Sequence, residues 1–167
     1  MQNKVLAQRN TLVVGTDAGY VIERYYLSQF GCKTVRCETG VGAARESMTK
    51  NYPLIILPVR IAPGKVEDAP DLPELEGIWH SGDTVDERYF EIALQVCRYT
   101  RQHEAPNRNS LVIFADTFEP EEDSLLPSVK SRVLDAGADR YFYMLADEWS
   151  DAFVDLISER LHWRKQV

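Results

Sequence analysis

The sequence predicts an α/β domain in which helices cover both faces of a doubly wound, five-stranded parallel sheet, a (βα)5 arrangement. Two observations lead to this prediction. Short apolar and β-branched runs alternate with helical patterns along the chain, and the run at 53–59 (PLIILPV) is almost entirely apolar. An unbroken apolar run suits a strand buried on both faces of a parallel sheet. The alternation fits as well, because right-handed crossovers place helices on both faces.

The individual elements follow from the same patterns. Strand-like runs lie at 11–14, 33–38, 53–59, 111–115 and 140–145. Helical patterns lie at 20–30, 41–51, 86–103, 121–136 and 147–164. The fourth of these helices contains Pro127, which we expect to disturb it, and it is followed by Gly137, a residue that commonly ends helices. The last helix carries an apolar stripe that includes Trp149 and Phe153, as in a helix packed on a sheet.

One segment departs from this rhythm. Residues 61–83 are rich in proline and acidic side chains and predict a long loop, and loops of this length in compact domains commonly serve function. Within the segment, Trp79 either attaches the loop to the domain or anchors a partner. We expect residues 1–167 to form a single domain, with 162–167 as the possible start of a linker to another module.

Composition narrows the function classes. The chain has 167 residues and a formal net charge of −7, which repels phosphate backbones and argues against nucleic-acid binding by this segment. No run of apolar residues is long enough to span a membrane, and we expect the protein in the cytoplasm. The three cysteines, Cys32, Cys37 and Cys97, are an odd number without metal-type spacing, so we interpret them as free thiols.

Ligands of doubly wound sheets bind at the carboxyl ends of the strands. Three acidic residues near those ends, Asp17, Asp116 and Asp123, could together bind a cation. The alternative is structural, with Asp17 capping the first helix and Asp116 or Glu121 capping the fourth.

Other motifs carry little functional signal. The glycine pair at 15 and 19 lacks the third glycine of a dinucleotide fingerprint. The three histidines, at 80, 103 and 162, are scattered over a loop, a helix end and the tail, so we expect neither a metal centre nor a Ser-His-Asp arrangement.

Four motifs occur in the order and spacing of a known family: LVVGTDAG, YPLIILPVRIAPG, LVIFADTFEPEED and LDAGADRYFYML. Over residues 9–162 the chain resembles the CheY-like receiver domains of two-component response regulators. The most specific piece is AGAD-x-Y, at 136–141. The resemblance implies the flavodoxin-like receiver fold.

Receiver chemistry needs an aspartate nucleophile, acidic Mg²⁺ ligands, a hydroxyl group that holds the phosphoryl group, and a lysine that neutralises charge. The resemblance places these functions on residues that lack the required groups: Gly15 and Thr16 for the acidic pair, Pro58 for the nucleophile, Ala115 for the hydroxyl and Met144 for the lysine. Leu145 stands at the usual proline, and Asp17 is the only carboxylate near the first strand. The resemblance therefore implies a pseudo-receiver that is not an enzyme, with a degenerate phosphorylation pocket, no catalytic residue, no metal and no cofactor.

In receivers, an aromatic residue three positions before the lysine couples the pocket to the signalling surface, and the resemblance places it at Tyr141. We expect Tyr141 to hold one position, and Tyr141, Tyr143 and Trp149 to form the interaction face. The leading hypothesis is a regulatory domain that works by phosphorylation-independent contact with a protein partner or output domain, as a homodimer.

Two alternatives remain open. One is a small-ligand sensor with an apolar pocket made by Pro58, Ala115 and Met144. The other is a phosphorelay receiver that uses a displaced aspartate such as Asp116.

Overall fold

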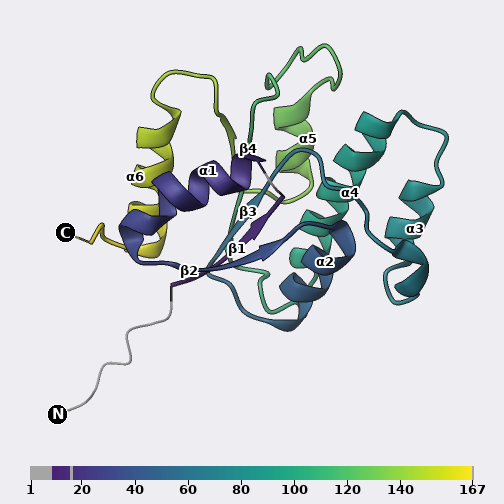
Figure 1. Cartoon of the computed structure of the whole chain (residues 1–167), viewed down its shortest axis with the longest axis horizontal. Helices are drawn as coiled ribbons and strands as arrows, with labels where there is room; N and C mark the ends of the chain where they lie inside the picture. The colour runs from purple at the N-terminus through teal and green to yellow at the C-terminus, as the bar shows by residue number, and fades with distance from the viewer. Residues whose placement is uncertain (1–8, 16, 167) are drawn as a thin grey trace.

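Five parallel strands form one sheet in the order β2-β1-β3-β4-β5. The computed structural model describes residues 9–15 and 17–166 (Figure 1). The strands are β1 (Asn10–Val14), β2 (Lys33–Cys37), β3 (Leu54–Leu57), β4 (Leu111–Asp116) and β5 (Arg140–Tyr143). The predicted fold class, a doubly wound five-stranded parallel sheet, is confirmed.

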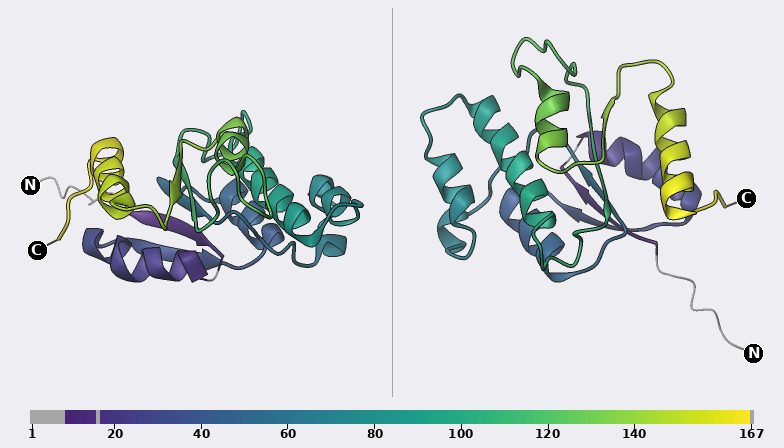
Figure 2. Two further views of the ribbon diagram at one scale, coloured as in Figure 1. Left: turned by 90° about the horizontal axis from the view of Figure 1, so that it is seen from above. Right: turned by 180° about the vertical axis from the view of Figure 1, so that it is seen from behind.

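Helices cover both faces of this sheet, and the core is divided accordingly (Figure 2). One face packs against α1 (Asp17–Tyr25), the 3-10 turn η1 (Leu27–Phe30) and α6 (Trp149–Leu161). The other face packs against α2 (Gly40–Thr49), α4 (Val85–Thr100) and α5 (Val129–Asp135). The first predicted helix is thus divided into α1 and η1.

The central strands show why an apolar run was needed. All four residues of β3 are buried, and they alternate between the two core layers, with Ile55 and Leu57 on the α4 side and Leu54 and Ile56 on the α6 side. Successive side chains of a strand point to opposite faces, so a strand covered on both sides must be apolar at every position.

The prediction for the fourth helix was wrong in its extent. The expected span was 121–136, whereas α5 contains only Val129–Asp135. The carboxylate of Asp123 accepts hydrogen bonds from the backbone N–H groups of Leu125 and Leu126, which turns the chain before the helix begins. Such local side-chain to backbone bonds compete with helix formation, and Pro127 has no N–H to donate.

The segment at 61–83 is more ordered than the predicted long loop. It contains the 3-10 turn η2 (Val66–Asp68) and the helix α3 (Pro73–Trp79), which packs on α4. Leu72 and Leu75 are fully buried. These apolar residues attach the segment to the domain, a feature that its proline and acidic content concealed.

Trp79 attaches this segment rather than standing free. It is half-buried, its ring stacks on Tyr89 of α4 at 6.1 Å between centroids, and the guanidinium of Arg88 lies 4.8 Å from the Trp79 ring centre. Of the two interpretations of Trp79, attachment of the segment is the one that the packing supports.

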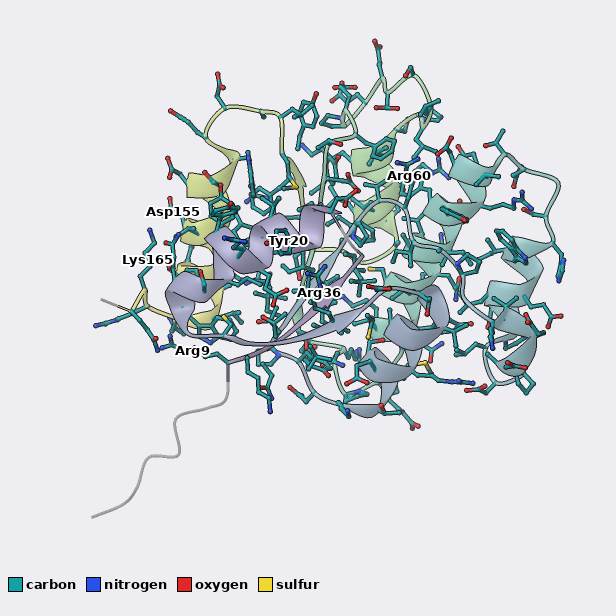
Figure 3. The ribbon with its side chains drawn as sticks, in the orientation of Figure 1. Arg9, Tyr20, Arg36, Arg60, Asp155 and Lys165 are labelled. Atoms are coloured by element: carbon teal, nitrogen blue, oxygen red, sulfur yellow. The ribbon has the colours of Figure 1, made fainter. Side chains whose placement is uncertain are left out.

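The C-terminal residues also pack against the domain. Trp163 is 8% exposed, with its ring 6.5 Å from that of Phe30, and the backbone N–H of Gln166 donates to the carbonyl of Gln29. Residues up to 166 therefore lie against the η1 side of the domain, where we had expected a linker to start. Lys165 and the α6 residue Asp155 mark this side in Figure 3.

Two further expectations concern the cysteines and membranes. Cys32 and Cys37 are half-buried, Cys97 is buried, and all three are free thiols, as interpreted from their number and spacing. None of the helices formed by residues 9–15 and 17–166 combines the length and apolar character needed to cross a bilayer.

Candidate functional site

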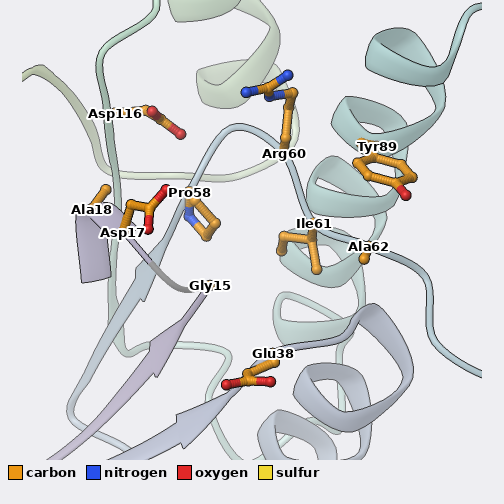
Figure 4. Close-up of a pocket in the computed structure, with 10 residues that line it drawn as sticks. All are labelled: Gly15, Asp17, Ala18, Glu38, Pro58, Arg60, Ile61, Ala62, Tyr89 and Asp116. Atoms are coloured by element: carbon orange, nitrogen blue, oxygen red, sulfur yellow. The ribbon is translucent and has the colours of Figure 1, made fainter. Parts of the chain in front are cut away.

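A cleft of about 380 Å³ lies at the carboxyl ends of β1 and β3 (Figure 4). We call it the strand-end cleft. Its lining residues are Gly15, Asp17, Ala18, Glu38, Pro58, Arg60, Ile61, Ala62, Tyr89 and Asp116. Its position agrees with the expectation that sites of doubly wound sheets form where the strands end.

Pro58 follows β3 directly and occupies the position that the resemblance assigns to the phosphoacceptor. Its ring lies against Gly15, where an added Cβ would come within 2.7 Å of the Pro58 Cγ atom. Gly15 also has a φ of +92°, a conformation that residues with side chains rarely adopt. The end of β1 is therefore shaped to accept the proline ring, and the ring carries no group that could form an acyl phosphate.

The predicted degenerate pocket is only partly assembled. Gly15, Asp17 and Pro58 line the strand-end cleft together. Ala115 is buried, and Met144 is half-buried, in the core layer beneath α1 and α6. Thr16 lies outside the described residues.

The apolar pocket expected for a ligand sensor is therefore not formed by its three proposed members, since of these only Pro58 reaches the cleft. Ala115 lies within β4, which has a core layer on each face, and its side chain points into the layer beneath α1 and α6.

Asp116 connects two neighbouring strand ends. Its Oδ2 accepts a hydrogen bond from the backbone N–H of Val59 at 2.8 Å, and its Oδ1 accepts one from the N–H of Thr117 at 2.7 Å. The expected role of Asp116 as cap of the fourth helix is wrong, because α5 begins only at Val129. Both carboxylate oxygens instead hold backbone groups at the ends of β3 and β4.

The other two proposed caps differ in outcome: the position of Asp17 agrees with the prediction, and the role given to Glu121 is wrong. Asp17 is the first residue of α1. A negative charge in the first turn interacts favourably with the helix dipole and stabilises the helix. Glu121 lies in the loop before α5 and does not cap it. Asp123 holds its own loop, and hydrogen bonds to its carboxylate, chiefly from the Leu125 N–H, lower the pKa of Asp123 below its usual value.

The electrostatic character of the strand-end cleft is mixed. Three carboxylates, from Asp17, Glu38 and Asp116, share the lining with one guanidinium, from Arg60. Within the part of the chain that the structure describes, no three His, Cys, Asp or Glu side chains come together in a way that could hold a metal ion. Among the described residues, the carboxylates that line the cleft are therefore not arranged as ligands of one metal ion.

Tyr141 is buried, in contrast to its expected place on an interaction face. It is 7% exposed, and its hydroxyl donates a hydrogen bond to the backbone carbonyl of Phe118. Burial raises the pKa of Tyr141 above its ordinary value, and the nearby carboxylate of Asp116 acts in the same direction. In this structure Tyr141 has a defined hydrogen-bond partner inside the protein.

The three residues of the expected face lie on two sides of β5. Tyr143 is half-buried against the same core layer as Tyr141, whereas Trp149 packs on the opposite sheet face. The Trp149 ring contacts Tyr26 at 5.0 Å and Phe153 at 5.9 Å between centroids. The two tyrosines of β5 and Trp149 of α6 therefore face opposite core layers and do not make one exposed patch.

Arg60 lines the cleft, and sequence reasoning assigned it no functional role. Its Nη1 atom lies 2.6 Å from Oδ1 of Asp86, and its Cζ lies 4.8 Å from the centre of the Phe118 ring. Both partners are distant in sequence, so no local pattern connects them. The only available signal was the position of Arg60, two residues beyond Pro58 at the end of a central strand.

Comparison with known proteins identifies the fold. No family model and no curated protein matches the sequence. Among solved structures, the receiver domain of a sensor histidine kinase from Pseudomonas aeruginosa PAO1, with a magnesium ion coordinated in its active-site cleft, is similar with a TM-score of 0.59 and 15% identity. That match covers 93% of this chain and 99% of the other.

Two further structures agree. A putative response regulator from Chloroflexus aurantiacus J-10-fl has a TM-score of 0.58 at 16% identity, over 93% of this chain and 98% of the other. A CheY-like receiver domain protein from Methanospirillum hungatei JF-1 has a TM-score of 0.58 at 11% identity, over 93% and 95%. The class that the fold defines is the receiver fold, and at these identities the similarity concerns the fold alone.

Proposed function

We propose that this chain is a receiver-like regulatory domain that acts in signal transduction without being phosphorylated, through contact with a protein partner. The observation that carries the proposal is Pro58, which sits buried in the strand-end cleft at the end of β3. Formation of an acyl phosphate needs a carboxylate nucleophile, and a proline ring has none. In this proposal the domain is not an enzyme.

Asp116, the carboxylate proposed as a displaced nucleophile, already accepts two backbone hydrogen bonds. Asp116 holds the N–H of Val59 with one oxygen and the N–H of Thr117 with the other. Transfer of a phosphoryl group to either oxygen would displace a backbone hydrogen bond at a strand end. This geometry favours the pseudo-receiver over a receiver with a displaced aspartate.

Protein contact is supported by the surface beside the edge strand. Leu134 of α5 is 38% exposed and Leu145, just after β5, is 66% exposed. A groove of about 440 Å³ runs along α5 and is lined by Pro120, Lys130 and Leu134 among others. An exposed leucine in this groove, and a second one just after the edge strand, suit a partner, output domain or second copy of this chain. The net charge of −7 disfavours nucleic acid as that partner.

Incubation with acetyl phosphate and Mg²⁺, followed by intact mass measurement, tests the absence of phosphorylation. A receiver domain that retains its aspartate is the positive control. We expect the control to gain one phosphoryl group and this chain to gain none. A stable phosphoryl adduct on this chain would overturn the proposal, and its loss in an Asp116→Asn variant would assign it to the displaced-aspartate alternative.

A small-ligand sensor is the second candidate, and the volume of the strand-end cleft favours it. At about 380 Å³ the cleft lies within the range of small-molecule sites. A ligand bound only by the folded protein raises the melting temperature, so a thermal-shift screen of metabolites tests this candidate. Stabilisation that is lost in an Arg60→Gln variant would favour the sensor.

A further inference from the structure

Arg60 joins two parts of the chain that no strand or helix connects. Its guanidinium pairs with Asp86, in the first turn of α4, with 2.6 Å between Nη1 and Oδ1. The same guanidinium lies over the ring of Phe118, at 4.8 Å from the ring centre, in the loop that leads from β4 to α5. Figure 4 shows this guanidinium at the rim of the strand-end cleft. One side chain thus bridges the start of α4 and the β4–α5 loop, residues 117–128.

Phe118 in turn contacts Tyr141 through a hydrogen bond. The backbone carbonyl of Phe118 accepts the hydrogen bond from the Tyr141 hydroxyl, and the two residues are 8% and 7% exposed. If the partner of a buried hydroxyl moves away, the folded protein is destabilised, because no water replaces the lost hydrogen bond. The position of Phe118 and the buried arrangement of Tyr141 are therefore linked.

The backbone beneath Arg60 is held as well. The N–H of the preceding residue, Val59, donates to the Asp116 carboxylate at the end of β4. The positive charge of Arg60 also contributes to the lowered pKa of Asp123, after the larger effect of the Leu125 N–H, and Asp123 organises the β4–α5 loop. The backbone next to Arg60 is therefore held by a hydrogen bond, and the Arg60 side chain contacts this loop through stacking on Phe118 and through its positive charge.

We propose that Arg60 is a positioning residue that holds the β4–α5 loop, and through the Phe118 carbonyl Tyr141, in one buried arrangement without a phosphoryl group. The inference rests on the proposed function, because it names what maintains the single state of a receiver-like domain that is not phosphorylated. The contact depends on the planar guanidinium, which stacks on the aromatic face and pairs with a carboxylate at the same time.

The experiment compares three variants of the full chain. Arg60→Gln removes the charge, and Arg60→Lys keeps the charge but lacks the planar group that stacks on Phe118. Arg45→Gln is the matched control, since Arg45 also pairs with an aspartate, Asp71, at 3.3 Å, but lies on α2. Two readouts are followed by mass spectrometry: amide hydrogen exchange of residues 117–126, and nitration of Tyr141 by tetranitromethane.

We expect Arg60→Gln to increase exchange in residues 117–126 by about fivefold, the combined effect of one partly exposed stacking contact and one partly exposed ion pair. Nitration of Tyr141 should rise by a similar factor. Arg60→Lys should fall between the wild type and Arg60→Gln, and Arg45→Gln should match the wild type in both readouts.

Two results would overturn the inference. One is wild-type exchange and nitration in Arg60→Gln. The other is an equal rise of exchange in β1, which would mean that Arg60 supports the whole fold and positions nothing in particular. Neither result bears on the absence of phosphorylation, which the acetyl phosphate experiment tests separately. Conversely, a phosphorylated wild-type chain would refute the proposed function even if Arg60 holds Tyr141.

Discussion

Replacement of Asp116 tests whether this carboxylate holds two strand ends together. The Asp116→Ala variant leaves the backbone N–H groups of Val59 and Thr117 without their acceptors, which now lie at 2.8 and 2.7 Å. Val59 is fully buried, whereas Thr117 is exposed and its N–H can bind water instead. The cost of the replacement therefore arises mainly at Val59.

The expected loss can be worked from that single buried donor. A buried N–H left without a partner costs about 1–3 kcal/mol, so we expect Asp116→Ala to lower the free energy of unfolding by about 2 kcal/mol. Asp116→Asn keeps one neutral acceptor and should lose about 1 kcal/mol, because hydrogen bonds to charged groups are stronger than those to neutral groups. With a urea m-value of about 2 kcal/mol/M, the unfolding midpoints should fall by about 1 M and about 0.5 M.

Urea unfolding followed by circular dichroism measures both variants. Asp155→Ala, at an exposed position of α6 (Figure 3), is the control for removal of a negative charge and should stay within about 0.5 kcal/mol of the wild type. If Asp116→Ala unfolds at the wild-type midpoint, then the carboxylate does not stabilise the strand ends. The geometric argument against its use as a displaced phosphoacceptor would then fail.

Two further predictions concern groups whose pKa is shifted. Burial raises the pKa of Cys97 to about 12. Iodoacetamide at mildly alkaline pH should therefore leave Cys97 unmodified in the folded protein and label it in urea. Labelling of Cys97 at the rate of Cys32 in the folded protein would contradict this. The Tyr99 hydroxyl lowers the pKa of Glu74, so the stability that this carboxylate adds is present above about pH 4 and is lost as the pH falls through the lowered pKa. Glu74→Gln should therefore weaken the loss of stability between about pH 5 and pH 3 in urea unfolding, and equal pH profiles of variant and wild type would refute the assignment.

The sheet was predictable because its signals are local. The apolar run around β3 and the β-branched run of β1 identify buried parallel strands, and the AGAD-x-Y motif leads into β5 as expected. The helix before that motif was predicted too long. Asp123 and Pro127 stop it from starting earlier, and the turn that Asp123 organises depends on backbone N–H groups that a periodicity argument does not consider.

The site was predictable in place but not in composition. Gly15, Asp17 and Pro58 meet in the strand-end cleft because neighbouring parallel strands end at the same edge of the sheet. Tyr141 was assigned to a contact face, yet its hydroxyl reaches the carbonyl of Phe118, 23 residues away in sequence. That partner follows from how the β4–α5 loop packs, which no local pattern encodes.

The sequence by itself determined the five strands in their order along the chain and the absence of a carboxylate at position 58, since both depend on residue type and on spacing along the chain. Only the tertiary structure decided what the remaining polar groups do. Arg60 finds Asp86 across 26 residues, and Asp116 finds the N–H of Val59 across 57. Contacts between residues so far apart in sequence form only when distant strand ends and loops pack together. Buried polar groups then form hydrogen bonds with the partners that the packing places next to them.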